Sequence, residues 1–468
     1  MKGTVVKVER LLASTIKLID DGLLKPGERL RSIRAGASEQ GVSKNTMAEA
    51  YERLVALGYL EARRGAGYFV NRMPRKSAQE LPSHVVEAID IVSFLREQLE
   101  QHYEVRVGDG RPPPSWMEGP ELGNLLRPNR HARHAEFGHG YGSPWGYAPL
   151  RERIALLLAE RSIEATPGQV LLTQGANHAL DLLVRQLVQA GDTVLVDSPG
   201  YYPLFGKLKL AKVSAVGVAR RPDGPDLEDL AAKAAAHRPK VFFTQSLAHN
   251  STGGSITLAG AHRVLQLASR HGFLIVEDDP FADILPAASP RLAALDQLEN
   301  VVYVSSFSKT LSASLRVGYV AAARPLVQAL CDLKMVTHAS TSDFVERIVY
   351  ELIASGQYLR HLRRLRSKVA AVTAGSLAGL EACGLEVFAP PSGGYYLWVK
   401  LPPHIDDRVL ARQAAAEGIF LAPGSVFQSE RAPAAPAMRV NVAYVEDQRF
   451  LAFMGRRLGA GAGASAVP

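Results

Sequence analysis

Hydrophobic positions recur with a helical period near the N-terminal end of the chain and with a mixed pattern beyond it. In the first segment, apolar residues such as Val5, Val8 and Leu12 stand three or four positions apart, and glycine and proline interrupt the pattern. The helices that this pattern predicts cover residues 5–21, 32–40 and 44–57. Ser43 is placed to cap the last of them, and Gly58 is placed to end it.

Two short runs of strand-forming residues follow these helices. Residues 59–63 and 67–70 flank Arg64-Gly65-Ala66-Gly67, a sequence that favours a tight turn in a β-hairpin. The glycines of this turn would let the backbone approach another molecule closely. Two helices joined by a turn and followed by a hairpin have the order of a winged helix-turn-helix, which binds DNA.

Beyond residue 105, short apolar runs alternate with helical segments rich in alanine and leucine. The runs with strand character are 170–172, 193–196, 241–243, 273–277 and 301–304. Clear helical segments between them are 177–189 and 260–271. This alternation predicts an α/β domain with a mainly parallel sheet covered on both faces. Ligands of such sheets bind beyond the carboxyl ends of the strands.

The chain of 468 residues is too long for one ordinary core. The predicted parts are a DNA-binding domain at 1–72, a linker at 73–104, the α/β domain at 105–458 and a disordered tail rich in glycine and alanine at 459–468. The linker begins without apolar periodicity and should be flexible there. Apolar residues of its second half recur at helical spacing, so we expect that part to pack.

Composition restricts the class of protein. Hydrophobic residues make up 47% of the chain, but the sequence contains no apolar run long enough to cross a membrane. The N-terminal residues also lack the pattern of a secretory signal. Cys331 and Cys383 are the only cysteines, and their spacing indicates neither a disulfide framework nor a zinc site. We therefore expect a cytoplasmic protein that does not contact a membrane.

Charge is concentrated near the N-terminal end. The first 75 residues contain 14 lysines and arginines against 8 aspartates and glutamates, a net +6 of the total +8. A basic patch on a small domain is expected of a protein that binds the DNA backbone, although a solvated basic face gives the same count. Together with the predicted helix-turn-helix, the charge favours double-stranded operator DNA as a partner.

Lys309 stands where a strand-like run breaks into small and hydroxylic residues, in Val304-Ser-Ser-Phe-Ser-Lys309-Thr-Leu-Ser-Ala-Ser-Leu-Arg316. A lysine that forms a Schiff base with pyridoxal 5′-phosphate (PLP) needs a strand end in a partly desolvated cleft. An ordinary surface lysine would leave the companion motifs around it unexplained.

Two groups of residues are placed to hold the phosphate of this cofactor. Gly175, Ala176 and Asn177 follow a strand and open a helix, so their backbone N–H groups and the helix dipole can point at an anion. The second group surrounds the lysine and consists of Ser306, Ser308 and Arg316. The guanidinium of an arginine can add a forked pair of donors to the same phosphate.

The pyridine ring of the cofactor has two candidate partners. Tyr201 follows a strand, where its ring can stack on the pyridine. Asp278 lies at the end of a buried strand, where a carboxylate requires a partner. A protonated pyridine nitrogen would be that partner, and its protonation makes PLP an electron sink. Lys309, Asp278 and Tyr201 are thus the predicted catalytic set.

Several motifs near the N-terminal end resemble the winged helix-turn-helix of the GntR family of bacterial regulators. They are Leu24-Lys-Pro-Gly-Glu-Arg-Leu30, Gly41-Val-Ser-Lys-Asn-Thr46, Leu54-x-x-x-Gly58-Tyr-Leu60 and Arg64-Gly-x-Gly-Tyr-Phe-Val70. The resemblance implies DNA contacts by Arg34, Ser43, Lys44, Asn45, Thr46, Arg64 and Gly65. Arg31 departs from the family, which usually has proline there.

The motifs of the larger part resemble the fold-type I aminotransferases. They are Tyr141-Gly-Ser-Pro-Trp-Gly146, His249-Asn250-x-Thr-Gly253, Glu277-Asp-Asp-Pro280, Ser306-x-Ser-Lys309, Pro423-Gly-Ser-x-Phe427 and Met438-Arg439-Val-Asn-Val. The resemblance implies an internal aldimine at Lys309, Asp278 at the pyridine nitrogen and Asn250 at the 3′-oxygen. It also implies that Arg439 binds a substrate or effector carboxylate and that Tyr141 reaches the phosphate of the neighbouring subunit.

Two positions depart from this second family. Phe281 stands where the family commonly has a tyrosine that donates to the 3′-oxygen, and Ser251 replaces the usual proline after Asn250. The loss of one donor weakens the case for fast transamination but not the case for PLP.

A GntR-like domain joined to an aminotransferase-like domain resembles the MocR subfamily of bacterial regulators. The resemblance implies a homodimeric, PLP-dependent transcriptional regulator that senses PLP or an amino acid or amine through an aldimine at Lys309. The aminotransferase-like domain would then serve mainly for sensing, with residual transaminase activity possible. The alternative is a PLP-dependent aminotransferase with a secondary DNA-binding domain.

Overall fold

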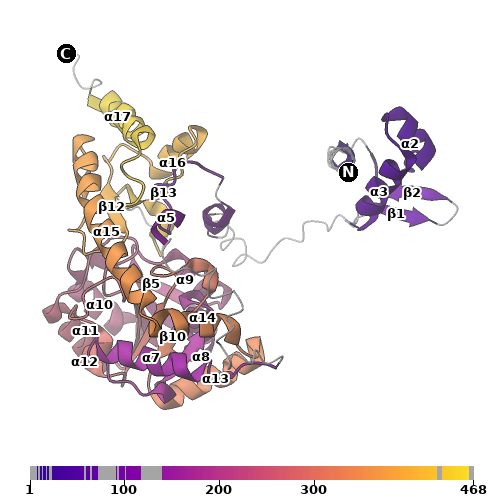
Figure 1. The fold of residues 1–468 in the computed structure, drawn as a ribbon. Helices are drawn as coiled ribbons and strands as arrows, with labels where there is room; N and C mark the ends of the chain where they lie inside the picture. Colours follow the sequence, from indigo (N-terminus) through magenta and orange to yellow (C-terminus); the bar gives the residue numbers. More distant parts are fainter. Residues whose placement is uncertain are drawn as a thin grey trace. The chain divides into compact units, whose positions relative to one another are not determined.

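The computed structural model describes residues 24–56, 59–63, 66–71, 94–100, 102–117, 140–429 and 435–462, together with residue 91 and scattered positions between 8 and 19. The chain divides into two compact units, Met1–Leu81 and Pro82–Pro468 (Figure 1). Within the described residues, none of the helices is both long and apolar enough to cross a membrane.

The small unit has the predicted order of helices and strands. Its elements are α2 (Ile33–Glu39), α3 (Lys44–Ala56), β1 (Leu60–Arg63) and β2 (Gly67–Val70). The two strands pair antiparallel, from Leu60 opposite Val70 to Arg63 opposite Gly67. The core between helices and hairpin includes Leu12, Met47, Tyr51, Leu54 and Leu60. The tip of the hairpin, residues 64 and 65, lies outside the described residues.

The large unit is built on an eight-stranded sheet. In spatial order its strands are β3 (Val170–Thr173), β10 (Gly318–Ala321), β9 (Val301–Ser306), β8 (Leu274–Asp278), β7 (Val241–Thr244), β4 (Thr193–Ser198), β5 (Ser214–Arg221) and β6 (Gly224–Pro225). Neighbours from β9 to β5 pair parallel, whereas β10 and β6 run antiparallel to their neighbours. The predicted mainly parallel sheet is therefore confirmed.

Side chains alternate between the two faces of this sheet and enter two separate cores. In β9, for example, Val301 and Tyr303 belong to one core, and Val302 and Val304 belong to the other. The first face is covered by α7 (Ala148–Ala159), α10 (Leu227–His237), α11 (Leu258–His271), α12 (Leu292–Asp296), α14 (Asp343–Ala354) and the start of α15 (Gln357–Ala382). The second is covered by α8 (Ala176–Leu187), α9 (Tyr202–Leu210) and α13 (Arg324–His338). Helices on both faces are the predicted arrangement.

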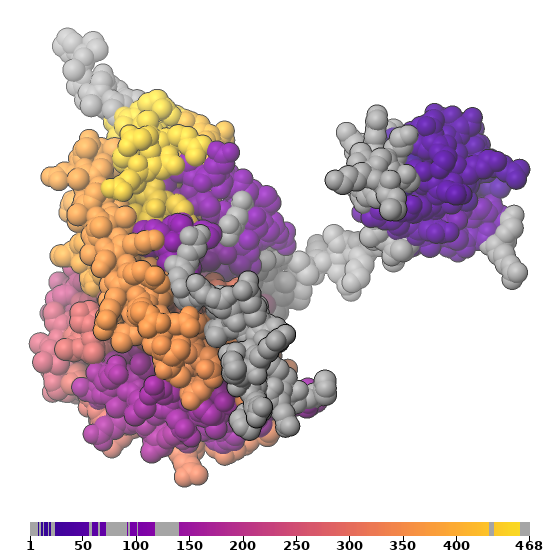
Figure 2. Space-filling view, in the orientation of Figure 1, coloured from indigo at the N-terminus to yellow at the C-terminus, as the bar shows by residue number. Residues whose placement is uncertain are grey.

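A smaller antiparallel sheet carries the C-terminal part of the chain. Its order is β11 (Glu386–Val387), β12 (Tyr396–Lys400), β14 (Ala437–Asn441) and β13 (Ala422–Pro423), with α16 (Asp407–Ala416) and α17 (Gln448–Ala462) beside it. The segment that contains α5 (Pro114–Met117) lies against this sheet, since the N–H of Phe420 donates to the Val105 carbonyl at 2.8 Å. Figure 2 shows this early purple segment beside the yellow C-terminal elements.

The ends of the large unit can be compared with the sequence. Residues 94–100 are helical, and Phe94 and Leu95 pack against a core of the large unit, as expected for the second half of the predicted linker. Helix α17 continues to Ala462, past residue 459 where a disordered tail was predicted to begin. Alanine has the highest helix propensity, and it offsets the interspersed glycines in this last turn.

Candidate functional site

Lys309 lies just beyond the end of β9, at the carboxyl edge of the large sheet. Its side chain is half-buried, and its ammonium group donates a hydrogen bond to the carbonyl of Gly110. The carbonyl of Lys309 accepts a 2.6 Å hydrogen bond from the hydroxyl of Tyr395, and the next residue, Thr310, shares a 2.7 Å hydrogen bond with Tyr358. Hydrogen bonds therefore fix the backbone carbonyl of the lysine and the residue after it, while its amine contacts Gly110.

Asp278 ends the neighbouring strand β8 and is buried. One carboxylate oxygen accepts a 2.6 Å hydrogen bond from the amide of Gln245, and the other has no partner among the described residues. Burial raises the pKa of Asp278 to about 7, and the positive charge of Lys309 opposes this rise. A buried oxygen without a partner fits a ligand that offers an N–H, such as a protonated pyridine nitrogen.

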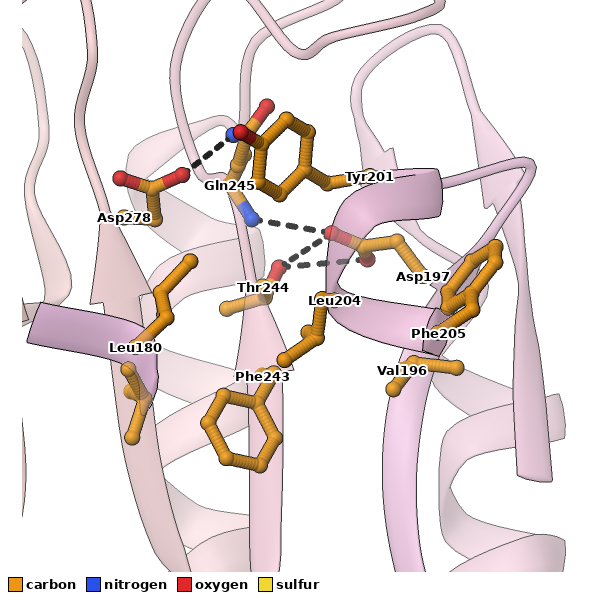
Figure 3. Close-up of a pocket in the computed structure, with 11 residues that line it drawn as sticks. Leu180, Val196, Asp197, Tyr201, Leu204, Phe205, Phe243, Thr244, Gln245 and Asp278 are labelled. Carbon is orange, nitrogen blue, oxygen red and sulfur yellow. Dashed lines mark hydrogen bonds between the residues drawn. The ribbon is translucent and has the colours of Figure 1, made fainter. Parts of the chain in front are cut away.

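Gln245 organises this site and was not singled out by sequence reasoning. Its side-chain oxygen accepts from the N–H of Asn250 at 2.8 Å, and its own N–H donates to Asp197 at 2.9 Å. Figure 3 shows Gln245 between Asp278 and Asp197, with the ring of Tyr201 beside it. Its position directly after a predicted strand, beside the strand that ends in Asp278, was the signal that could have found it.

A buried charged group lies behind Gln245. Asp197 accepts hydrogen bonds from Thr244 at 3.0 Å and Arg220 at 3.2 Å, and His249 lies 3.4 Å from it. Burial acts to raise the pKa of Asp197, but Arg220 and His249 outweigh it and the pKa is lowered. An ionised Asp197 thus fixes the backbone of Gln245.

Two buried histidines near the site, His249 and His178, are structural. Burial lowers the pKa of His249 to about 4, with Arg220 adding to the effect. Burial and the nearby His338 lower the pKa of His178 to about 4, and its ring accepts a 3.0 Å hydrogen bond from the N–H of Gln174. Both rings are therefore neutral near pH 7 and support loops of the site.

Tyr201 and Asn250 lie at the same carboxyl edge of the sheet. Tyr201 lines a pocket together with Asp278 and Gln245. Burial and the charge of Asp278 raise the pKa of Tyr201, so its phenol is neutral and presents an uncharged ring. The side-chain oxygen of Asn250 accepts a 2.9 Å hydrogen bond from Arg439. Tyr201 thus lines the pocket with Asp278, and Asn250 is held nearby by its contacts with Gln245 and Arg439.

The predicted phosphate-binding residues meet where β3 turns into α8. Arg316 donates to the Gln174 carbonyl at 2.9 Å and to the Ser308 hydroxyl at 3.5 Å. Gly175 has φ 78°, and a Cβ there would lie 2.8 Å from the guanidinium of Arg316. Glycine is therefore required, because it lets the arginine lie against the first turn of α8, which starts with Ala176 and Asn177.

The antiparallel strand β10 brings these two loops together. A Cβ on Gly318, the first residue of β10, would lie 2.7 Å from the backbone of Gly175. Ser306, at the end of β9, is opposite Gly318 in the sheet, and its hydroxyl accepts from the N–H of Ser308 at 3.4 Å. The donors near the lysine and those of the α8 turn can therefore act on one anion.

Arg439 is almost fully buried, with 1% of its surface exposed. Besides Asn250, its guanidinium donates to the carbonyl of Gly108 at 2.7 Å, and its Nε has no partner among the described residues. It lies 4.6 Å from the ring centroid of Tyr396 and 4.9 Å from that of Phe427. A buried cation with a spare donor fits a carboxylate ligand.

Phe281 is fully buried and packs edge-on against two tyrosine rings, at 5.0 Å from Tyr395 and 5.5 Å from Tyr396. The hydroxyl of Tyr396 donates to the Gly110 carbonyl at 2.8 Å, the same carbonyl that Lys309 contacts. Tyr396 is also buried in the hydrophobic core of the large unit. Its hydroxyl adds a hydrogen bond at the edge of the site.

Tyr141 is not brought to these residues within the chain, since 91% of its side chain is exposed. The loop that follows it is fixed by the buried Lys334, which donates to the carbonyls of Pro144 and Leu172 at 2.8 Å each. Burial lowers the pKa of Lys334 to about 8, although Glu346 attracts its charge. The loop is thus anchored while its tip projects into solvent.

The predicted DNA-contacting residues of the small unit fall into two kinds. Arg34, Lys44 and Asn45 are exposed near the starts of α2 and α3. Thr46 is buried and shares a 2.8 Å hydrogen bond with the exposed Ser43, whose hydroxyl also accepts from the N–H of Thr46. These two residues therefore cap α3. Arg64 and Gly65 lie outside the described residues.

The family model "Aminotransferase class I and II" matches residues 108–456, about three quarters of the chain. The chain belongs to this family. A second model, "Bacterial regulatory proteins, gntR family", matches residues 8–70. A GntR domain followed by an aminotransferase class I and II domain is the arrangement of the MocR subfamily, as the sequence motifs predicted.

Similar curated proteins match most of the length of this chain. The "Uncharacterized HTH-type transcriptional regulator YdcR" of Escherichia coli is 28% identical over 437 residues, which cover 90% of this chain and 92% of that protein. The "Probable rhizopine catabolism regulatory protein MocR" of Rhizobium meliloti is 28% identical, with coverage of 86% and 83%. This MocR-type chain therefore matches regulators along both of its domains.

Solved structures match the aminotransferase domain. LysN, an alpha-aminoadipate aminotransferase from Thermus thermophilus complexed with N-(5′-phosphopyridoxyl)-L-leucine, has a TM-score of 0.71 at 26% identity. It aligns with 80% of this chain and 97% of its own. The kynurenine aminotransferase of Pyrococcus horikoshii has a TM-score of 0.72 at 23% identity, over 81% of this chain and 95% of its own. The aminotransferase class I and II fold supports PLP as the cofactor.

Proposed function

We propose that the protein is a PLP-dependent, DNA-binding transcriptional regulator. The observation that carries this proposal is the presence, in one chain, of a GntR domain and an aminotransferase domain with Lys309 and the partly unsatisfied Asp278 at one sheet edge. The small unit would bind operator DNA in the bacterial cytoplasm, and the large unit would bind the ligand that changes the affinity for DNA.

The roles of the site residues follow from their contacts. PLP, when bound, supplies an aldehyde that reacts with amines and a pyridinium ring that withdraws electrons. Lys309 would provide the amine, Asp278 would keep the ring nitrogen protonated, and Tyr201 would cover one face of the ring. Asn250 would donate to the 3′-oxygen of the ring. The phosphate would be held by Gly175, Ala176, Asn177, Ser306, Ser308 and Arg316.

The effector of this regulator would be PLP itself or an amino compound that takes the place of Lys309. Arg439 would bind the carboxylate of such a compound, because its Nε is buried without a partner among the described residues. We also propose a homodimer in which the exposed Tyr141 of one subunit reaches the phosphate of the other. A ligand changes DNA affinity only if it binds the DNA-competent and incompetent states unequally.

The test combines visible absorbance with a DNA footprint. Purified protein mixed with PLP should show a band near the violet edge that is absent in Lys309→Ala. It should also protect a segment between its own gene and the neighbouring gene, with an affinity that falls as salt rises. Failure to protect any promoter DNA, with or without PLP, would refute the regulator.

A second candidate is a PLP-dependent aminotransferase with a secondary DNA-binding domain. The set of Lys309, Asp278, Asn250 and Arg439 favours it, because these residues are the ones that transamination requires in the family. Sustained turnover that depends on a keto acid, without a specific footprint, would favour this enzyme. Phe281 argues for slow turnover, since its ring cannot donate to the 3′-oxygen.

A further inference from the structure

Residues 106–111 form a segment whose backbone carbonyls are used by side chains of the candidate cofactor site. The donors to Gly110 are Lys309 and, at 2.8 Å, the hydroxyl of Tyr396. Arg439 donates to Gly108 at 2.7 Å, and Asn441 donates to Asp109 at 3.0 Å and to Arg111 at 2.8 Å. Two of these donors, Lys309 and Arg439, are the residues proposed to engage the coenzyme and the effector.

The same segment also holds the helical residues 94–100. Arg106 and Arg111 both donate to the backbone carbonyl of Gln98, Arg106 at 3.4 Å. Asp109 fixes both arginines, at 2.7 Å from Arg106 and 3.4 Å from Arg111. A Cβ on Gly110 would lie 3.0 Å from the side-chain oxygen of Gln98. The 106–111 segment therefore lies between the site and Gln98.

Residues 94–100 are the last part of the chain that leads from the DNA-binding unit. Phe94 packs its ring 5.3 Å from that of Tyr202, which follows the pocket residue Tyr201. The side-chain nitrogen of Gln98 is buried without a hydrogen-bond partner among the described residues. Residues 94–100 thus lie against the large unit beside the candidate site, and one of their buried polar atoms lacks a hydrogen-bond partner among the described residues.

We propose that the 106–111 segment couples the state of Lys309 to residues 94–100, and thereby to DNA binding; this inference rests on the function proposed above. For the nitrogen of Lys309 to condense with the coenzyme's aldehyde, its ammonium group would first release one proton to solvent; a carbon–nitrogen double bond would then form, and the aldehyde oxygen would leave as water with the two remaining amine protons. The nitrogen then no longer offers its ammonium protons to Gly110. One of the hydrogen bonds that hold the segment is lost, and the helix at 94–100 is held less firmly.

Two coenzyme forms distinguish this coupling from binding alone. Pyridoxal 5′-phosphate takes the amine of Lys309, whereas pyridoxamine 5′-phosphate has no aldehyde and leaves it free. In hydrogen exchange of the full chain, both should protect residues 173–180. Amides of residues 94–100 should exchange about fivefold faster with the aldehyde form than with the amine form, which is the effect of losing one net hydrogen bond.

Three variants make the test specific. In Lys309→Ala the two forms should give equal exchange at residues 94–100. In Arg111→Met the difference between the forms should shrink to less than about twofold, and so should any effect of PLP on operator affinity, because Gln98 loses a donor. The matched control is Arg449→Met, an arginine on α17 that pairs with the exposed Glu104 and should retain the wild-type response.

The outcomes separate this inference from the function on which it rests. Equal exchange at residues 94–100 with both forms, in a protein that shows the visible band and protection at 173–180, would overturn the coupling and leave the cofactor site intact. Absence of the band and of that protection would overturn both. An unchanged response in Arg111→Met would assign the coupling to another route and refute this one.

Discussion

The amide group of Gln245 donates a 2.6 Å hydrogen bond to one carboxylate oxygen of Asp278. The backbone of Gln245 is in turn held by Asp197, so the amide has little freedom to turn away. The second oxygen of Asp278 is left for a ligand. A residue outside the predicted cofactor contacts therefore fixes the carboxylate of Asp278 that is proposed to meet the ring.

Replacement of this amide should weaken coenzyme binding most at low pH. In Gln245→Leu, Asp278 loses the hydrogen bond that stabilises its charged form, so its pKa should rise beyond the wild-type value of about 7. We expect PLP affinity to fall about tenfold near pH 6.5 and less near pH 8.5, where the carboxylate ionises in both proteins. Absorbance titrations measure this, and Gln266→Leu, on the exposed face of α11, is the control. Equal losses at both pH values would contradict the electrostatic role.

Asp278 should also destabilise the coenzyme-free fold above neutral pH. Its pKa is about 7 in the fold and 3.8 ordinarily, so its contribution to stability is full below the lower value and is lost as pH rises through the upper one. Coenzyme-free Asp278→Asn should exceed the wild type in free energy of unfolding at about pH 8, by at most about 4 kcal/mol, and differ little at about pH 4. Urea unfolding at both pH values decides this, and a constant difference would reject the assignment.

Arg316 should control affinity for the phosphate. Arg316→Met removes a charge-assisted donor beside Gly175, and we expect PLP to bind about tenfold to a hundredfold more weakly. Pyridoxal without the phosphate should bind the variant and the wild type alike. Arg185→Met, at an exposed position near the other end of α8, serves as the matched control. Equal losses for the two ligands would place Arg316 away from the phosphate.

A tyrosine at position 281 should restore the donor that this chain lacks. Phe281→Tyr adds a hydroxyl, which would stabilise an ionised 3′-oxygen on the coenzyme. The pH at which the visible band changes should then fall by about one unit, because a hydrogen bond to the charged form favours it. Transaminase turnover should rise with it. A band that titrates unchanged would show that the hydroxyl does not reach the oxygen.

Arg34 should contribute to DNA binding through charge. Arg34→Ala should weaken binding to operator and to unrelated DNA alike and reduce the slope of log affinity against log salt by about one. Arg270→Ala, in the last turn of α11, controls for the change in net charge. A loss confined to the operator would instead assign Arg34 to base recognition.

The alternation of strands and helices predicted the large sheet well, because buried parallel strands require continuous apolar runs such as 241–243 and 301–304. The ends of those runs also located Asp278 and Lys309. Ser43 was recognised as a helix cap, since capping depends on neighbours in the sequence. These features share one property: their physical cause lies within a few residues of the feature itself.

Contacts between distant segments were not predictable in the same way. Gln245 pairs with Asp278, Gly110 with Lys309, and Lys334 with Pro144, and each pair is joined by folding alone. The sequence can place each residue of a pair at a strand end or in a loop, but it does not show which residues will be hydrogen-bonded. The helical spacing in the second half of the linker predicted that this part would pack, but not that its partners would be Tyr202 and Phe420.

The close approach of Gly318 to Gly175 limits which substitutions this protein can accept. A single methyl added at Gly318 would push apart two loops that lie far from each other in the sequence. The affinity for PLP would then fall, whether or not the reaction at Lys309 was still possible. Transaminase turnover, in contrast, can be lowered by a change such as phenylalanine at position 281 without disturbing these loops. The close contact between Gly318 and Gly175 leaves no room for a side chain, so the proposed sensing of PLP could persist in a chain whose turnover is slow.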